Sequence, residues 1–226
     1  ANGNGVQNTA VTFAVTAGGG TLSATSVTTD AQGRAQSTLT LGAAVAANTV
    51  TASATGLTPA TFTASATAAP ASRIALTSGT GQTGVAGSAL AQPFAVTVTD
   101  ANGNGVQGFM LSFTVSAGGG TISASNVTTD AQGRAQTVLT LGATAGTNEV
   151  TANAAGLTGS PITFSANGTA GTPATLARTS GNNQSGTAGG ALAQPFVVTV
   201  TDAGGNAVAG HAVAFAVATG NGTLST

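Results

Sequence analysis

The sequence predicts an all-β chain of tandem sandwich domains, and three observations support this fold class. Ala101–Gly142 restates Ala1–Gly42 at an offset of 100 residues, and the pattern begins again at Thr201. Strand patterns recur along the chain, whereas helical patterns are nearly missing. Each copy is also as long as one small sandwich domain and too long for a solenoid unit or propeller blade, whose periods are roughly 20 to 50 residues. We therefore expect each copy to be a domain of its own.

The copies divide the chain into one complete repeat and two partial ones. The second copy gains two residues near Gly159, so the repeat is 100 to 102 residues long. Successive copies join through a few residues that contain Pro70 or Pro173, and short Pro-bearing joints limit bending between domains. We expect the domains to be arranged as a rod. The expected divisions are the C-terminal part of a repeat over 1–69, a complete repeat over 70–170 and the N-terminal part of a repeat over 171–226.

Alternation of apolar and polar residues predicts the strands of the complete repeat. Phe94, Val96 and Val98 recur at every second position, which is the period of a half-buried strand. Clusters of Gly and Asn separate such runs. The expected strands lie near 73–78, 94–100, 107–116, 121–124, 134–142, 148–155 and 161–167. Seven strands in about 100 residues are typical of an immunoglobulin-like antiparallel β-sandwich.

The composition is that of a folded chain with almost no charge. Only 4% of the residues are charged, 41% are hydrophobic and the net charge is −1, whereas disordered chains combine low hydrophobicity with high net charge. Four basic residues, spread over the chain, do not form the cationic patch that nucleic acid or an anionic membrane surface requires. The sequence contains no run of about 20 strongly apolar residues, which is the pattern that would predict a membrane-spanning helix. The chain has no cysteine, which excludes disulfides and thiol chemistry.

Phenylalanine is the only aromatic residue type, and we expect it to anchor a thin core. Thr, Ala and Val supply most of the other inward positions. Phe13, Phe113 and Phe215 occupy equivalent positions in the three copies, as do Phe94 and Phe196 in two of them. Replacing any of them by Ala is expected to cost about 3–5 kcal/mol of stability.

The motif Thr-Asp-Ala-Asn-Gly-Asn-Gly at 99–105 admits two interpretations. Counted from Asp100, it has oxygen-bearing side chains at positions 1, 3 and 5 and Gly at position 6, like the first half of a calcium-binding loop. Such a loop also needs a carboxylate at position 12, which is Leu111 here. A turn between two strands uses the same residues, because Asp accepts backbone N–H groups while Asn and Gly adopt positive φ. The sequence favours the turn, with calcium as the alternative.

A second motif, Thr-Thr-Asp-Ala-Gln-Gly-Arg-Ala, occurs at 28–35 and again at 128–135. Asp130 and Arg134 flank a glycine-bearing turn and are placed to pair across it, but an exposed pair contributes only about 0–1 kcal/mol. We expect the pair to set strand register and solubility. No His or second carboxylate accompanies it, so general acid–base catalysis is not indicated.

No residue is predicted to be catalytic, to bind a cofactor or to ligate a metal. His211 is the sole histidine, and its equivalents are Phe109 and Thr9, so no ligand set recurs. The Gly-Gly-Gly runs at 18–20 and 118–120 precede strands rather than helices, which argues against a phosphate-binding loop. We predict that the protein is not an enzyme.

Three segments follow one another in a fixed order along the copies. They are Pro-Phe-x-Val-Thr-Val-Thr-Asp-Ala-x-Gly-Asn from Pro93, Phe-x-Val followed by Gly-Gly-Gly-Thr, and Thr-Thr-Asp-Ala-Gln-Gly-Arg-Ala. This order resembles the bacterial Ig-like domain (Big-1) of the invasin and intimin group. The resemblance implies Ig-like domains that act as stalk segments in surface adhesins and large repetitive exoproteins. Receptor binding in those adhesins belongs to terminal modules, and nothing like a Cys- and Trp-bearing lectin tip occurs here.

We therefore expect a non-enzymatic extracellular stalk or spacer of a bacterial surface adhesin or repetitive exoprotein, which projects a distal binding module. The expected location is extracellular, either on the bacterial cell surface or secreted. The alternatives are a subunit of a self-associating extracellular fibre or sheath, and a phage or virion appendage. Expected partners are further Ig-like repeats of the same chain and, because a neutral Thr-rich surface lacks charge repulsion, laterally associated copies. No nucleic acid, membrane or cofactor is expected to bind this segment. Residues 1–24 and 203–226 cover the same part of the repeat, which favours a window on a longer chain.

Overall fold

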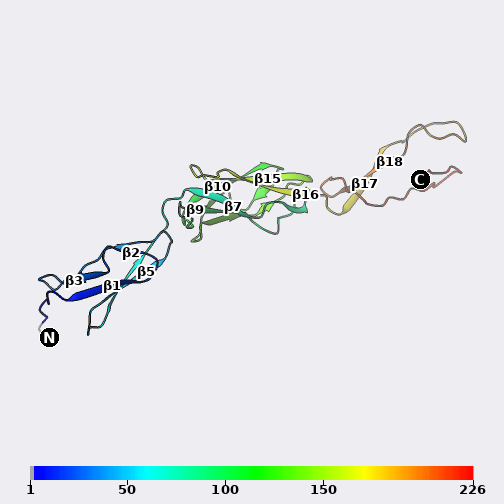
Figure 1. Ribbon diagram of the computed structural model, residues 1–226. Helices are drawn as coiled ribbons and strands as arrows, with labels where there is room; N and C mark the ends of the chain where they lie inside the picture. Colours follow the sequence, from blue (N-terminus) through cyan, green and yellow to red (C-terminus); the bar gives the residue numbers. More distant parts are fainter. Residues whose placement is uncertain (1–2, 226) are drawn as a thin grey trace.

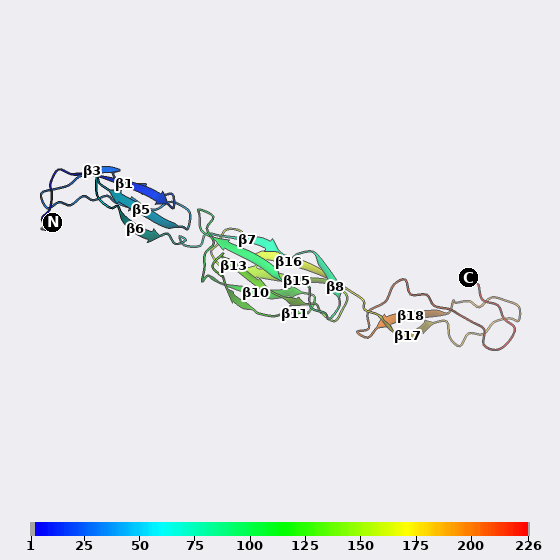
Figure 2. The ribbon, with the colours of Figure 1, turned by 90° about the horizontal axis from the view of Figure 1, so that it is seen from below.

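The structure of the protein is a computed structural model that describes residues 3–225. Every regular element among these residues is a strand, so the predicted all-β class is confirmed. The three copies lie end to end along an elongated molecule (Figures 1 and 2). No helix of the described residues has the length and apolar character needed to cross a membrane. Ala1 and Asn2, the first residues of the predicted segment 1–69, and Thr226, the last residue of the predicted segment 171–226, lie outside the described residues.

The middle copy is a sandwich of two sheets. One sheet has the strand order β12-β10-β15-β16-β8 and the other β13-β9-β7, with β11 and β14 as a separate pair. All neighbouring strands are antiparallel except β8 and β16, which are parallel. The bounds are β7 Arg73–Ser78, β8 Gln82–Val85, β9 Phe94–Thr99, β10 Met110–Ala117, β11 Thr121–Ile122, β12 Asn126–Thr128, β13 Arg134–Thr137, β14 Leu139–Thr140, β15 Gly146–Asn153 and β16 Ile162–Thr169.

The partial copies repeat parts of this sandwich. In the first copy the sheet order is β3-β1-β5-β6, with β2 and β4 as a pair, and the last copy has the pair β17 and β18. Phe13 lies opposite Ala52 in the first copy, just as Phe113 lies opposite Ala152 in the middle one. The bounds are β1 Ala10–Ala17, β2 Thr21–Leu22, β3 Ser26–Thr28, β4 Leu39–Thr40, β5 Ala47–Ser53, β6 Ala60–Ser65, β17 Pro173–Ser180 and β18 Val197–Asp202. The first and middle copies, which have similar sequences here, therefore pair these two strands in the same register.

All seven expected strands of the middle copy are present, but the prediction was wrong in two respects. It missed β8 and β12, because β12 has only three residues and β8 contains Gly84, so neither shows an apolar alternation. It also treated 134–142 as one strand. The chain changes partner at Val138, since β13 pairs with β9 whereas β14 pairs with β11.

The core of the middle copy lies between its two sheets and is organised by phenylalanine. Phe94, Phe113 and Phe164 are almost completely buried. The Phe94 and Phe164 rings stack with centroids 4.8 Å apart, and Phe113 lies tilted 6.4 Å from Phe164. Each comes from a different strand, β9, β10 or β16, so the rings connect both sheets. The predicted role of Phe94 and Phe113 as packing anchors is confirmed.

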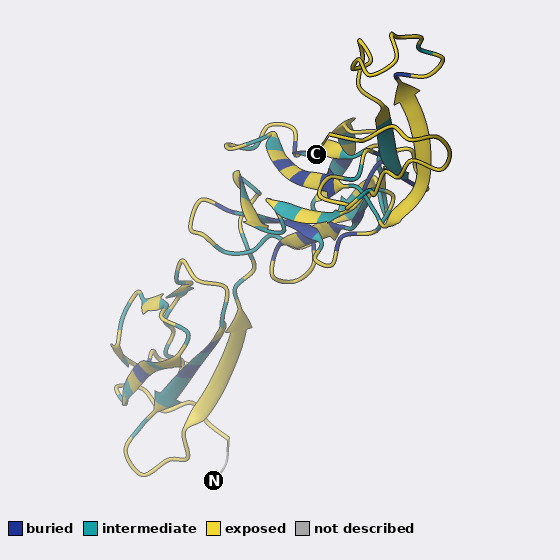
Figure 3. Cartoon of the chain, turned by 90° about the vertical axis from the view of Figure 1, so that its right-hand side faces the viewer, coloured by how far each residue is buried: buried dark blue, intermediate teal, exposed yellow. Residues whose placement is uncertain are grey.

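The same prediction was wrong for the last copy. Phe196 and Phe215 are 49% and 50% exposed, although their equivalents in the middle copy are buried. In the first copy Phe13 is buried, but Phe62, the equivalent of Phe164, is 56% exposed. Each partial copy contains only some of the strands of a sandwich, so one face of its sheet is uncovered in this chain. Figure 3 shows the resulting exposed strands toward both ends.

Candidate functional site: the joints between repeats

The first recurring motif folds as a turn that follows β9. Asp100 is 3% exposed, and its Oδ1 accepts hydrogen bonds from the backbone N–H groups of Asn102 and Asn104, both at 2.9 Å. The N–H of Gly103 donates to the Asp100 carbonyl at 3.2 Å, and Gly103 has a φ of 87°, which favours glycine. The favoured interpretation of this motif, a turn, is the one that the structure has.

The second carboxylate oxygen of Asp100 ties this turn to the segment that links two copies. The backbone N–H of Ala69 donates to Oδ2 at 3.0 Å, and Nδ2 of Asn104 donates to it at 2.9 Å. The Asn104 amide is the largest cause that lowers the pKa of Asp100, and with the backbone donors it outweighs desolvation, so this pKa falls from 3.8 to about 2.

The calcium alternative finds no support in this geometry. Asp100 accepts four hydrogen bonds, two at each oxygen, which fills the capacity of a carboxylate. A calcium ligand has to direct oxygen lone pairs at the ion instead. Leu111, at the position of the missing carboxylate, is buried in the core. Between residues 3 and 225 the structure contains no group of three or more His, Cys, Asp or Glu side chains that could hold a metal ion.

The side chain of Asn104 crosses from the middle copy to the first. Its Nδ2 donates to the carbonyl oxygen of Ala43 at 2.8 Å, and its Oδ1 accepts from the N–H of Val45 at 3.1 Å. These partners lie in the loop between β4 and β5. Two hydrogen bonds to one planar amide fix both the position and the orientation of that loop. We call the set of Asp100, Asn104, Ala69 and the loop 43–45 the first joint.

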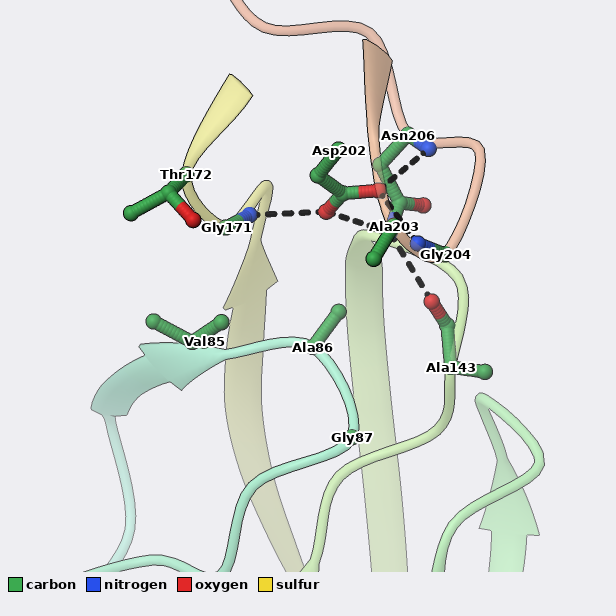
Figure 4. A pocket seen from close by; sticks show the side chains of 10 residues that line it. All are labelled: Val85, Ala86, Gly87, Ala143, Gly171, Thr172, Asp202, Ala203, Gly204 and Asn206. Atoms are coloured by element: carbon green, nitrogen blue, oxygen red, sulfur yellow. Dashed lines mark hydrogen bonds between the residues drawn. The ribbon is translucent and has the colours of Figure 1, made fainter. Parts of the chain in front are cut away.

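The same arrangement recurs between the middle and last copies. Nδ2 of Asn206 donates to the carbonyl oxygen of Ala143 at 2.9 Å, and the N–H of Ala145 donates to Oδ1 of Asn206 at 2.7 Å. Asp202 accepts from the linker N–H of Gly171 at 2.7 Å and from Nδ2 of Asn206 at 3.0 Å (Figure 4). We call the set of Asp202, Asn206, Gly171 and the loop 143–145 the second joint.

The electrostatics of the two joints also agree. The Gly171 N–H is the first cause, and the Asn206 amide the second, that lower the pKa of Asp202 to about 2. The turn of the last copy has Gly204 where the middle copy has Asn102. This change leaves the geometry intact, because only the backbone N–H of that residue donates to the aspartate in either copy.

A buried asparagine supports the loop that each joint contacts. Asn148 is fully buried; its Oδ1 accepts from the N–H of Gly142 at 2.9 Å, and its Nδ2 donates to the carbonyl oxygen of Gly146 at 3.1 Å. The Gly-Gly-Gly run packs over this amide, since a Cβ on Gly118 would overlap the Asn148 side chain. In the first copy Nδ2 of Asn48 holds the Ala46 carbonyl oxygen in the same way, at 3.1 Å. The glycine run therefore serves close packing.

The second recurring motif forms another turn, which packs against the first. The N–H groups of Gln132 and Arg134 donate to Oδ1 of Asp130 at 2.9 and 2.8 Å. A Cβ on Gly105 would overlap the Gln132 carbonyl, so the two turns touch through backbone. Asp130 thus closes its own turn through these backbone donors, and Arg134 begins β13, where it lies opposite Thr97.

The ion pair expected across this turn occurs in the first copy. Nε of Arg34 lies 3.3 Å from Oδ2 of Asp30, and both side chains are well exposed, so the pair contributes little to stability. The backbone N–H of Arg34 is the first cause that lowers the pKa of Asp30. Within residues 3–225 this is the sole ion pair shorter than 4.0 Å, so Asp130 and Arg134 do not pair directly.

An open hollow of about 360 Å³ lies beside the second joint. Figure 4 shows the residues around it, which line the hollow mainly with backbone atoms and with small side chains such as those of Ala86, Ala143 and Ala203. Asp202 is the one ionisable side chain of the lining, and its oxygens already accept hydrogen bonds from the joint. No second ionisable side chain accompanies Asp202 in this lining.

The contact between copies is not predicted by the motif, which indicates only a local turn. Asn104 and Asn206 also donate hydrogen bonds to the preceding copy. A signal was present, because Asn4, Asn104 and Asn206 keep the same residue in all three copies while Asn102 does not. His211 is exposed in the last copy. That no residue is catalytic or binds a cofactor or metal stays a prediction.

The comparisons with known proteins agree with this architecture. The sequence model of the bacterial Ig-like domain (group 1) matches residues 80–167. The adhesin FdeC of Escherichia coli is 20% identical, the alignment covers 92% of this chain and 67% of the FdeC chain, and the TM-score is 0.59. InvD of Yersinia pseudotuberculosis is 18% identical over 91% of this chain and 63% of its own, with a TM-score of 0.56. The chain spans about two thirds of these structures, and the likeness shows a shared fold. No curated protein matches the chain.

Proposed function

We propose that the chain is a non-enzymatic spacer of a bacterial surface adhesin or repetitive exoprotein, and the match of residues 80–167 to the bacterial Ig-like domain (group 1) supports this proposal. Its repeats, divided at 69/70 and 170/171, hold a distal binding module away from the cell. The proposed location is the bacterial surface or the medium around it, and the immediate partners are further repeats of the same chain.

The observation that carries this proposal is the recurrence of one joint geometry at both junctions. A spacer has to transmit position from one end to the other, so successive domains must keep a fixed orientation. Asn104 and Asn206 each make a two-point contact with the preceding repeat, and Asp100 and Asp202 each hold the linker. A flexible string of domains needs none of these contacts.

The magnitude of these contacts is sufficient to keep a joint closed. A hydrogen bond contributes about 0.5–1.5 kcal/mol net in a folded protein. Three of them hold the first joint, from Asn104 to Ala43, from Val45 to Asn104 and from Ala69 to Asp100. Together they favour the closed joint by about 3 kcal/mol, which is a ratio of closed to open of about 100.

A distance measurement between two repeats tests the rigid spacer. The chain has no cysteine, so the double variant Thr28→Cys and Thr128→Cys takes spin labels at two exposed, equivalent positions of adjacent repeats. We expect a narrow distance distribution. Asn104→Ala should broaden it, whereas Asn102→Ala, which removes a side chain outside the joint, should not. A distribution that is already as broad without Asn104→Ala would overturn the rigid spacer.

Electron microscopy of the native source tests the cellular role. Material sheared from cells and labelled with an antibody against the middle repeat should show single strings of beads attached to the cell. Ordered filaments of constant diameter would instead make the protein a fibre subunit. Labelling confined to virions would make it an appendage of a phage.

A further inference from the structure

Asn104 is followed by glycine for a reason separate from its own role in the joint. Asn104 is needed for the contact with the first repeat, because an amide both donates to Ala43 and accepts from Val45. Gly105 is needed for the contact with the second turn, because a Cβ there would overlap the carbonyl oxygen of Gln132. Two packing demands therefore create an Asn-Gly dipeptide at the centre of the first joint.

This dipeptide has a chemistry of its own. The backbone nitrogen of the glycine loses its proton and forms a bond to Cγ of the asparagine, and Nδ2 leaves as ammonia. The resulting cyclic imide then takes up one water molecule and opens to aspartate or isoaspartate. Glycine favours the ring closure because it has no Cβ to obstruct it and its backbone is conformationally free. The reaction needs no enzyme and no reactant other than water.

We propose that Asn104 is a deamidation site that the closed first joint protects, and that its conversion loosens this joint irreversibly. Nδ2 of Asn104 lies 2.9 Å from Oδ2 of Asp100 and 2.8 Å from the Ala43 carbonyl oxygen. After deamidation an acidic oxygen replaces this donor. Two carboxylates then face each other at hydrogen-bond distance, and the Ala43 oxygen loses its partner, so repulsion replaces the attractive contacts of the amide.

Protection follows from the contacts that hold the amide in place. Ring closure requires the Asn104 side chain to rotate toward Gly105, which breaks its hydrogen bonds to Ala43, Val45 and Asp100. Asn102 is also followed by glycine, but its side chain is exposed, and among the described residues it makes no hydrogen bond through its amide. Asn102 is therefore an internal reference for the unprotected rate.

The second joint lacks the reactive sequence. Asn206 makes the same contacts as Asn104, but the next residue is Ala207, and a Cβ at that position hinders ring closure. The two joints thus have the same geometry and different chemical lifetimes. Ala207 is exposed, so glycine at this position leaves the joint contacts in place.

Peptide mass spectrometry of the whole chain during incubation in mildly alkaline buffer tests the proposal. We expect Asn102 to deamidate first and Asn104 about 100-fold more slowly, the factor for breaking three hydrogen bonds of ordinary net strength. Asn206 should react slower still. Ala207→Gly should raise the rate at Asn206 to that of Asn104. Equal rates at Asn102 and Asn104, or no effect of Ala207→Gly, would overturn the proposal.

A variant of the loop separates protection from local sequence. Val45→Pro removes the N–H that donates to Asn104 and should bring the Asn104 rate toward that of Asn102. Val45→Ala keeps the N–H, reproduces the residue of the second joint and should leave the rate unchanged. A thermal melt verifies that both variants are folded. If Val45→Pro does not fold, the test of the proposal rests on the Ala207→Gly variant.

The loosening itself rests on the proposed rigid spacer and has a separate readout. Asn104→Asp, which reproduces one product, should broaden the distance distribution between labels at 28 and 128. Acidification should narrow it again in part, because the introduced carboxyl group, once protonated, has one O–H that can donate to Asp100 but not also to Ala43, as the amide does. Slow deamidation at Asn104 with a distribution that stays narrow in Asn104→Asp would leave the modification site standing and overturn the loosening, whereas a distribution that is already broad in the unchanged chain would overturn the rigid spacer.

Discussion

Asn148 lies beneath the loop that Asn206 contacts, and it holds that loop from both sides. Its Oδ1 accepts from Gly142 and its Nδ2 donates to Gly146, while the residues between them present the Ala143 carbonyl and the Ala145 N–H to Asn206. A core side chain of one repeat therefore shapes the surface that the next repeat binds.

Asn148→Ala should destabilise the middle repeat by about 1–3 kcal/mol, because it leaves a buried N–H at Gly142 without an acceptor. The chain has no Trp or Tyr, so urea unfolding is followed best by circular dichroism. Asn126→Ala is the matched control, since Asn126 is exposed. Equal urea midpoints for the two variants would contradict the role of the buried amide.

Phe164→Ala and Phe62→Ala change equivalent residues and should differ strongly. Phe164 is fully buried between two rings, so its loss should cost about 3–5 kcal/mol. Phe62 is 56% exposed, and its loss should change stability by less than about 1 kcal/mol. Thermal melts of the two variants give the comparison, and similar shifts in melting temperature would show that Phe62 is covered in solution.

Gly105→Ala should destabilise the middle repeat by about 1–3 kcal/mol, because the added methyl group overlaps the Gln132 carbonyl and pushes the two turns apart. Gly168→Ala is a suitable control. A Cβ at Gly168 meets nothing closer than 3.4 Å, and glycine within a strand is unfavourable. Urea midpoints are compared, and a loss for Gly168→Ala as large as for Gly105→Ala would show that the overlap is not the cause.

Acid should open the joints only at very low pH. The pKa of Asp100 and that of Asp202 are lowered to about 2 in the closed joints, below the ordinary value of roughly 3.9. The closed state therefore binds fewer protons, and the stabilisation is complete above about pH 4 and declines as the pH falls toward 2.

Distances between labels at 28 and 128, measured from neutral pH down to about pH 2, check this expectation for the first joint. The distribution should stay narrow to about pH 4 and then broaden. Asp100→Asn should give a broad distribution at every pH, because an amide has one oxygen where the joint needs two. Broadening that begins near neutral pH would rule out Asp100 as the group that titrates.

The sequence predicts the repeats because the copies recur along the chain. It predicts the strand positions and the central core residues because apolar and polar residues alternate locally. Phe94 shows its burial through the period of its own strand. The exposure of Phe196 could not be predicted from that pattern, because burial depends on strands that only the complete copy has.

The joints could be predicted only in part. The turn at Asp100 follows from the chemistry of Asp, Asn and Gly within a few residues. The contact of Asn104 with Ala43 spans 61 residues and is made with a backbone carbonyl, which has no signature in any side chain. Only the persistence of asparagine at 4, 104 and 206 points to a demand beyond the turn.

Asn104 and Asn206 bind main-chain atoms, and the side chains of the loops they contact differ. Ala43-Ala44-Val45 in one copy corresponds to Ala143-Thr144-Ala145 in the next, with the same pairing to the asparagine. The joint therefore tolerates sequence drift in the contacted loop, because only main-chain atoms of that loop are recognised. If unequal recombination added or removed a whole unit that carries this asparagine, the same contact would be available at the new junction.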